Sequence, residues 1–336
     1  MERPYISLVV AGRNDDYGGD FNDRLQNSIA SLARYVEQYR LPLEYIIVNY
    51  NPISTKKSLY ETLKWPKSRK YLTFRIITVP NEVHQLMVDL EIRDKVPLYE
   101  YIAKNTGIRR AKGEFVAGAN PDIIYTPEII QYLSKRKLQE DYYYRADRCD
   151  FHKLEHITPG ELPEDIIPQL QKSAFRVFLK GHVYPIGFNN FFYPRLWWLK
   201  YQNQKRLNKE NAYGTMPPEF HYHCNCSGDF MMMHRSQWER LKGHPENTRV
   251  AAHTDSLFVI VAAAAGLKEK VFDYPVYHQN HDRRYTCDAE EVNPSVEAMY
   301  QRHVKEGNKM LKDGKPIIYN DDNWGLAQYD FHDIVF

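Results

Sequence analysis

Residues 98–133 read LYEYIAKNTGIRRAKGEFVAGANPDIIYTPEIIQYL, and this stretch decides the fold class. Its composition predicts a helix over residues 99–111 and a short apolar strand over residues 114–119, which ends sharply just before Asp122. In an open parallel sheet, ligands bind outside the carboxyl ends of the strands. Asp122 is therefore expected where a metal-bound phosphate or a sugar could be held. The structural alternative is that Asp122 only caps the following helix.

Three other apolar runs predict buried strands, over residues 5–11, 45–48 and 74–79. Helical spacing over residues 22–39 separates the first two, with Asn22 as the expected N-cap. Strands that alternate with helices predict an α/β fold with a mostly parallel central sheet flanked by helices. The strand exits would display one edge of polar side chains: Arg13, Asp15, Asp16, Asn49, Asn51, Asn81 and Asp122.

Composition excludes several classes of protein. The 336 residues include 45 basic and 43 acidic ones, so a net charge of +2 gives no field that would attract nucleic acid. No apolar run approaches the roughly 20 residues that span a bilayer, and the first residues lack a signal-peptide layout. Four cysteines do not suggest a disulfide framework. The expected location is cytoplasmic.

Residues 105–115, NTGIRRAKGEF, followed by Asn120 and Asp122, resemble the centre of family 2-like glycosyltransferases of the GT-A fold. In that family an Asn-x-Gly helix and an Ala-x-Gly turn lead into a strand that ends in a DXD-type metal motif. The resemblance implies a Rossmann-like catalytic domain. Its expected parts are a donor half over 1–133, an acceptor and catalytic half over 134–290 and a C-terminal extension over 291–336.

The resemblance also implies a site for a nucleotide-sugar donor. A divalent ion, Mn²⁺ or Mg²⁺, would be held by Asp122 with His278 or His281. Because Asn120 replaces the first acid of the motif, Arg283 and Arg284 are the alternative means of neutralising the leaving diphosphate. The implied donor-binding residues are Arg13, Asp15, Asp16, Asn49, Asn105, Arg109, Asn120, Asp122, Arg283 and Arg284.

A helix predicted to start near residue 254 carries the implied catalytic base. In the family an acid at this helix start deprotonates the incoming hydroxyl, and here that residue is Asp255, with His253 as the substitute. Helix capping is the structural alternative for Asp255. Asp229 and Trp324 are the expected acceptor-binding residues. Their structural alternatives are a turn-bonded aspartate and a packed C-terminal anchor.

Two other segments invite a functional interpretation. His221 to Cys226, HYHCNC, suggests zinc, but an extended strand would send the histidines and cysteines to opposite faces, and no second ligand pair follows. Residues 188–207 combine aromatic and basic side chains. They are expected to form an acceptor lid, a partner interface, a patch on a membrane surface or ordinary core. A further strand is predicted over residues 271–277.

The expected activity is therefore hexosyl or pentosyl transfer from a nucleotide-diphosphate sugar to a hydroxyl of a glycan or glycoconjugate. The likeness implies an inverting displacement and a role in polysaccharide biosynthesis. Two other classes stay open: a non-catalytic glycan-binding or scaffold protein, and a sugar-1-phosphate nucleotidyltransferase. A dinucleotide or P-loop site is excluded because neither GxGxxG nor GxxxxGK[ST] occurs.

Overall fold

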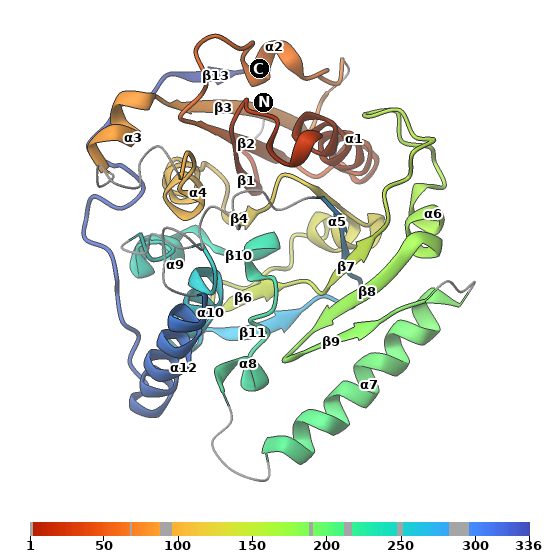
Figure 1. Cartoon of the computed structure of the whole chain (residues 1–336), viewed down its shortest axis with the longest axis vertical. Helices are drawn as coiled ribbons and strands as arrows, with labels where there is room; N and C mark the ends of the chain where they lie inside the picture. The colour runs from red at the N-terminus through yellow and green to blue at the C-terminus, as the bar shows by residue number, and fades with distance from the viewer. Residues whose placement is uncertain are drawn as a thin grey trace.

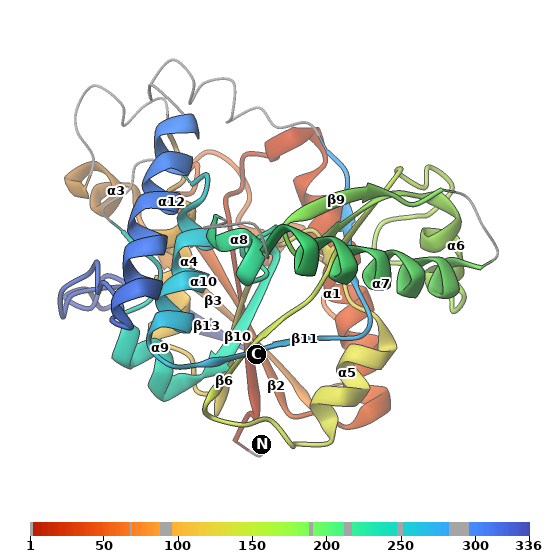
Figure 2. The ribbon, with the colours of Figure 1, turned by 90° about the horizontal axis from the view of Figure 1, so that it is seen from below.

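The computed structural model describes residues 3–67, 69–87, 96–187, 191–211, 217–246, 251–281 and 296–336. The strands of these residues form two sheets, and helices pack on both faces of the larger one (Figures 1 and 2). Arg283 and Arg284 lie outside the described residues, so their predicted role stays a prediction.

The larger sheet has eight described strands, four of whose seven neighbouring pairs are parallel. In spatial order they are β11 (Lys268–Val271), β6 (Tyr142–Arg145), β10 (Phe230–His234), β4 (Phe115–Ala119), β1 (Ile6–Gly12), β2 (Leu43–Tyr50), β3 (Leu72–Val79) and β13 (Asp333–Val335). The predicted α/β fold with a mostly parallel central sheet is confirmed.

The central strands are apolar on both faces because helices cover both. In β1, Leu8 and Val10 pack in one hydrophobic cluster, whereas Val9 and Ala11 pack in another. The first cluster includes residues of α1 (Phe21–Tyr39) and α5 (Pro127–Ser134). The second includes residues of α4 (Glu100–Arg109), α9 (Arg235–Leu241), α10 (Thr254–Ala264) and α12 (Val296–Asp313).

The smaller sheet separates a polar face from an apolar one. Its order is β5 (Ile123–Ile124), β12 (Val276–Gln279), β7 (Arg148–Phe151), β8 (Ala174–Leu179) and β9 (His182–Pro185). Cys149 and Tyr277 pack in a third cluster with side chains of α6 (Ile166–Ser173) and α7 (Phe192–Asn211). Because side chains alternate along a strand, Asp150 and His278 face the other side.

Short helices complete the described chain and correct some local predictions. They are η1 (Tyr17–Gly19), α2 (Leu59–Thr62), α3 (Asn81–Met87), α8 (Pro218–His221) and η2 (Ser227–Asp229). Residues 221–226 do not form the extended strand on which the argument against zinc was based, since the chain leaves α8 at His221 and turns. The N-cap of α1 is Asp20 rather than Asn22.

The strand predicted over residues 271–277 is also wrong, because it is two strands. β11 ends at Val271 in the larger sheet, and β12 begins at Val276 in the smaller one. The sequence does not reveal this change of sheet, because Val271 at the end of β11 and Val276 at the start of β12 are both apolar and at least partly buried. As a result the chain delivers His278 to the polar face of the smaller sheet, next to β5 and β7.

Candidate functional site

The carboxyl ends of β1, β2 and β3 are tied together by side chains. The Arg13 guanidinium, just past β1, donates to the backbone oxygen of Asn51 at 2.5 Å. The Asn81 amide, just past β3, donates to Asn51 Oδ1 at 2.7 Å. Three residues of the predicted polar edge, Arg13, Asn51 and Asn81, therefore lie together. Asn49 is only 3% exposed, and its Oδ1 has no hydrogen-bond partner among the described residues.

Three predicted metal ligands meet at the end of β4, and we call them the metal-ligand cluster: Asp122, His278 and His281. Their ligating atoms all lie within 4.8 Å of one another. Asp122 Oδ2 is 3.6 Å from Nε2 of His278 and 3.1 Å from Nε2 of His281. The residues converge because β12 pairs antiparallel with β5, which places His278 opposite Ile123.

Asp122 and His278 of the metal-ligand cluster are buried, His281 is partly buried, and their charges interact strongly. Burial opposes ionisation of Asp122, but the two histidines outweigh it and hold the pKa of this carboxyl well below its usual range. Burial likewise opposes charging of His278, but Asp122 and Asp150 raise its pKa to about 9. Without a metal, His278 is thus a cation between two carboxylates.

The residues present fit a divalent ion. Asp122 Oδ1 is buried and has no hydrogen-bond partner among the described residues, so one carboxylate oxygen is available as a ligand. One carboxylate with two imidazoles is a common donor set for divalent transition metals. Asp150 lies 3.2 Å from Nδ1 of His278 and would orient the ring so that Nε2 faces the ion.

Asp255, the expected base, belongs to a second buried polar group. Its Oδ2 accepts a hydrogen bond of 2.6 Å from the backbone amide of Gly228. The carbonyl of the same glycine accepts from the Lys104 ammonium at 2.8 Å, which also donates to Asn120 Oδ1 at 2.6 Å. Asp255 is the second residue of α10, and His253 is the N-cap, so capping does not account for this carboxylate.

A continuous chain of polar side chains joins this group to the metal-ligand cluster. The Asn120 amide donates to Asp229 Oδ1 at 2.6 Å, and the Arg148 guanidinium contacts Asp229 Oδ2 at 3.0 Å. Arg148 also contacts Asp150 Oδ1 at 2.5 Å, and Asp150 lies against His278. Asp229 is thus enclosed, at 2% exposure, between Asn120 and Arg148.

The first loop reaches the metal-ligand cluster through Tyr17. The ring centres of Tyr17 and His281 are 5.4 Å apart. Within this loop the Arg13 guanidinium and Asp15 form an ion pair of 3.0 Å, and Asp16 has a left-handed backbone with φ of 60°. The loop therefore links the edge formed by β1 and β2 with the cluster at β4.

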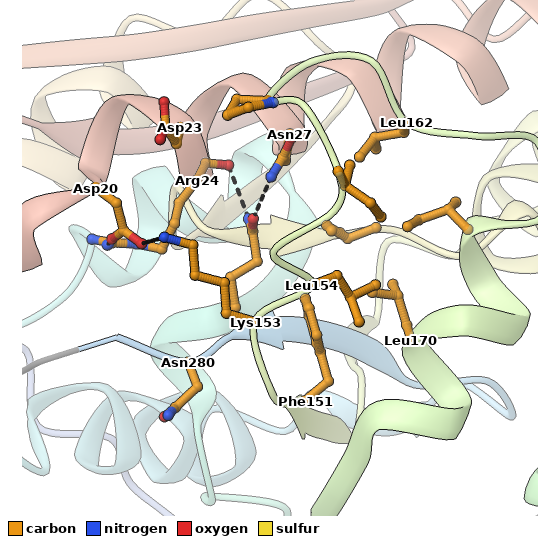
Figure 3. Close-up of a pocket in the computed structure, with 15 residues that line it drawn as sticks. Asp20, Asp23, Arg24, Asn27, Phe151, Lys153, Leu154, Leu162, Leu170 and Asn280 are labelled. Carbon is orange, nitrogen blue, oxygen red and sulfur yellow. Dashed lines mark hydrogen bonds and ion pairs between the residues drawn. The ribbon is translucent and has the colours of Figure 1, made fainter.

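Figure 3 shows a cavity of about 60 Å³, and its lining residue Arg24 connects it to the metal-ligand cluster. Its polar wall includes Asp20, Arg24 and Asn27 of α1, and Lys153 pairs with Asp20 at 3.2 Å. The Arg24 guanidinium also lies 3.8 Å from Asp122 Oδ2. The opposite wall is apolar and includes residues of α6. The space suffices for a few waters or one small substituent.

Several predicted site residues serve other contacts. The Asn105 amide donates to Glu246 Oε1 and to the His244 carbonyl, both at 2.8 Å. The Arg109 guanidinium donates to the Trp324 carbonyl at 3.0 Å and lies 5.1 Å from the centre of its ring. Trp324 is 4% exposed, so the structure places it in a packed C-terminal anchor.

His253 faces α12 as well as the start of α10. Its ring centre is 5.3 Å from that of Tyr300 and 6.2 Å from that of His303. Burial lowers the pKa of His253, so its imidazole is uncharged near neutral pH. It therefore stays the substitute base, and the nearby Asp255 carboxylate acts on its charge.

Glu246 makes the attachment of the C-terminal anchor that contains Trp324 sensitive to pH. Burial raises the pKa of Glu246 to about 7, although its carboxylate accepts hydrogen bonds from Asn105 and from the Gly325 amide. The folded protein therefore keeps a proton that the unfolded chain releases near its ordinary pKa of 4.5. Between these values, the free energy of unfolding is expected to fall as pH rises, by on the order of 1–3 kcal/mol.

Glu246→Gln tests this expectation, because glutamine keeps the accepting oxygen and cannot ionise. Urea unfolding of both proteins at about pH 5 and about pH 8 gives their free energies of unfolding. From the lower to the higher pH, the wild type should lose stability relative to the variant. A difference that does not change with pH would contradict the raised pKa.

Comparison with known proteins gives only a distant likeness in structure. No family model and no curated protein match this sequence. Among solved structures, the chain is similar to one described as "Crystal structure of GalNAc-T7 with UDP, GalNAc and Mn2+", with 10% identity and a TM-score of 0.48. The match covers 97% of this chain but 54% of the other, so this chain spans about half its length. Likeness this distant identifies no activity.

Proposed function

We propose that this chain is a metal-dependent glycosyltransferase that moves a sugar from a nucleotide-diphosphate sugar to a hydroxyl group. The single observation that carries the proposal is the metal-ligand cluster at the carboxyl end of β4, joined to Asp255 by a chain of polar contacts that ends at the Gly228 backbone. Strand ends of an α/β sheet are where nucleotide ligands bind, and a metal there suits a diphosphate. The resemblance of residues 105–122 to GT-A enzymes points to the same chemistry.

In the proposed reaction, Asp122, His278 and His281 would hold a divalent ion. Mn²⁺ fits this site better than Mg²⁺ does, because Mg²⁺ prefers oxygen ligands and two of the three ligands here are imidazoles. The ion supplies positive charge that stabilises the departing diphosphate. Asn49 and the first loop with Arg13 would contact the nucleotide. The donor would thus bind mainly to residues 1–133, and residues 134–290 would bind the acceptor and add His278 and His281 to the metal site.

Asp255 would take the proton of the incoming hydroxyl. The Gly228 amide fixes one carboxylate oxygen at 2.6 Å, which leaves Oδ1 to accept the proton. A carboxylate that acts as a base on the hydroxyl, opposite the leaving group, favours a single displacement with inversion. NMR of the product should then show an anomeric configuration opposite to that of the donor, and retained configuration would exclude this role for Asp255.

A thermal-shift screen tests the proposal. The full chain is heated with UDP-, GDP-, CMP- and dTDP-sugars, each with Mn²⁺ or with EDTA, because a ligand that binds only the folded state raises its stability. We expect one nucleotide class to raise the melting temperature, and EDTA to remove that effect. A shift that persists in EDTA would exclude the metal-ligand cluster from donor binding.

The absence of a shift with every nucleotide sugar would contradict the proposal and favour a glycan-binding protein. A nucleotidyltransferase is less consistent with the site, because the one arginine of the first loop already contacts Asn51 and Asp15. Nucleoside triphosphates added to the same screen distinguish that class.

A further inference from the structure

Helix α7 exposes an aromatic ridge that the proposed reaction does not use. Its side chains at Leu196 and Leu199 are buried with the third cluster, whereas Trp197, Trp198 and Tyr201 are 48%, 55% and 56% exposed. At 100° per residue, these three rings lie opposite the buried stripe, and Tyr201 is within one turn of both tryptophans. We call these three residues the aromatic ridge. Figure 1 shows α7 at the periphery of the molecule.

Basic side chains accompany the aromatic ridge. The helix contains five basic residues and one acid, Glu210, and so carries +4, whereas the whole chain carries +2. Arg195, Lys205 and Lys209 are exposed, and the Lys205 ammonium lies 4.5 Å from the centre of the Tyr201 ring. The one acid is already paired, with Arg206 at 2.8 Å. The exposed face is therefore aromatic and cationic.

This combination suits one partner better than others. Tryptophan and tyrosine favour the headgroup level of a bilayer, where the ring is buried and the polar atom stays hydrated. Each Lys or Arg near an anionic membrane surface contributes about 1 kcal/mol of attraction. A single straight helix that projects its ridge outward can lie in that interface, and no residue of α7 lines the cavity of Figure 3.

We propose that α7 is a docking surface for a phospholipid bilayer with anionic headgroups. The aromatic ridge enters the headgroup region, while the basic side chains meet the lipid phosphates. The helix lies in the interface and does not cross it, since no helix of the described residues is long and apolar enough to span a membrane. α7 packs on the apolar face of the smaller sheet, whose other face carries Asp150 and His278. Docking thus leaves the metal-ligand cluster on the side away from the lipid.

Sedimentation with vesicles tests this proposal on the full chain. Vesicles of phosphatidylcholine with about 30 mol% phosphatidylglycerol are compared with vesicles of phosphatidylcholine alone. The wild type is expected to sediment with the anionic vesicles. The triple variant Trp197→Ser, Trp198→Ser, Tyr201→Ser is expected to lose about tenfold in partition coefficient. Leu86→Ser on α3, at a side chain 76% exposed, is the matched control and should bind as the wild type does.

A second pair of variants tests the charges. Lys205→Gln, Arg206→Gln and Lys209→Gln together should remove the preference for anionic vesicles. The control removes the same charge from α12 through Lys305→Gln, Lys309→Gln and Lys312→Gln, which are exposed in the structure, and should keep that preference. Unchanged melting temperatures would show that these surface variants fold.

Three results would overturn the proposal. The first is that the wild type stays in the supernatant with both vesicle types, and the second is that the aromatic variant binds as the wild type does. The third is that the wild type self-associates in analytical ultracentrifugation without binding vesicles, while the aromatic variant is monomeric. That last result would assign α7 to a second copy of the chain.

Discussion

Asp122→Asn is expected to abolish tight Mn²⁺ binding and, with it, sugar transfer. Asp122 supplies the only carboxylate of the metal-ligand cluster and lies within 3.6 Å of both histidines. An amide offers a neutral oxygen in place of a charged one, so affinity for Mn²⁺ should fall by about a hundredfold or more. Isothermal titration with Mn²⁺ measures this directly, without any need for the sugar substrate.

A matched control separates ligand loss from a general change of charge. Asp23→Asn on α1 removes a nearby exposed carboxylate that lines the cavity and is outside the metal-ligand cluster, so Mn²⁺ affinity should stay within about twofold of the wild type. His281→Gln should weaken binding while leaving Asp122 in place. If Asp122→Asn binds Mn²⁺ as tightly as the wild type, the metal-dependent mechanism is wrong.

Asp255→Asn is expected to reduce turnover by on the order of a hundredfold or more while donor affinity stays unchanged. The asparagine oxygen can still accept the Gly228 amide hydrogen, which Asp255 now accepts at 2.6 Å, so the local structure should persist. Only the capacity to take a proton is lost. Initial rates with excess donor, together with the donor dissociation constant from thermal shifts, measure the two effects separately.

His253→Asn is the companion variant for this prediction. Asparagine tolerates the left-handed backbone that His253 adopts, with φ of 60°, so the start of α10 should be retained. Turnover within about threefold of the wild type would assign the base to Asp255. The opposite pattern, in which His253→Asn loses turnover and Asp255→Asn does not, would make His253 the base.

The central sheet was predictable because its strands follow from local sequence. β1 and β2 are apolar runs followed directly by polar exits, and helices separate them, so periodicity and turn residues fix their order. The meeting of Asp122 with His278 was predicted from family resemblance rather than from spacing. Residues 156 positions apart come together only through the pairing of β5 with β12.

Arg148 and Asp150 were not predicted as part of the site. They lie in residues 134–222, where short strands with charged alternate positions give weak periodic signals. One signal was present, since the run Arg148-Cys149-Asp150 places two charges on one face of a strand around an apolar residue. Their contact with His278 depends on the pairing of β7 with β12 and cannot be read from local sequence.

A patch on a membrane surface was one of four expectations for residues 188–207. Helical spacing alone would have predicted that many of these aromatic side chains are buried in the core. The described part of the segment is instead divided, with Leu196 buried and Trp198 more than half exposed. Which face of a helix meets a sheet depends on the tertiary structure, so the sequence left that choice open.

The alternating side chains of β12 make metal binding depend on the correct strand register. His278 faces the metal-ligand cluster, and Tyr277 faces the third hydrophobic cluster. A slip of one residue against β7 would exchange them, which would bury an imidazole among aliphatic side chains and remove a ligand. A divalent ion held by Asp122 and His278 binds only the native register. Metal binding would therefore shift the equilibrium from the slipped register to the native one by mass action. As a consequence, metal supply during synthesis would influence the yield of folded protein.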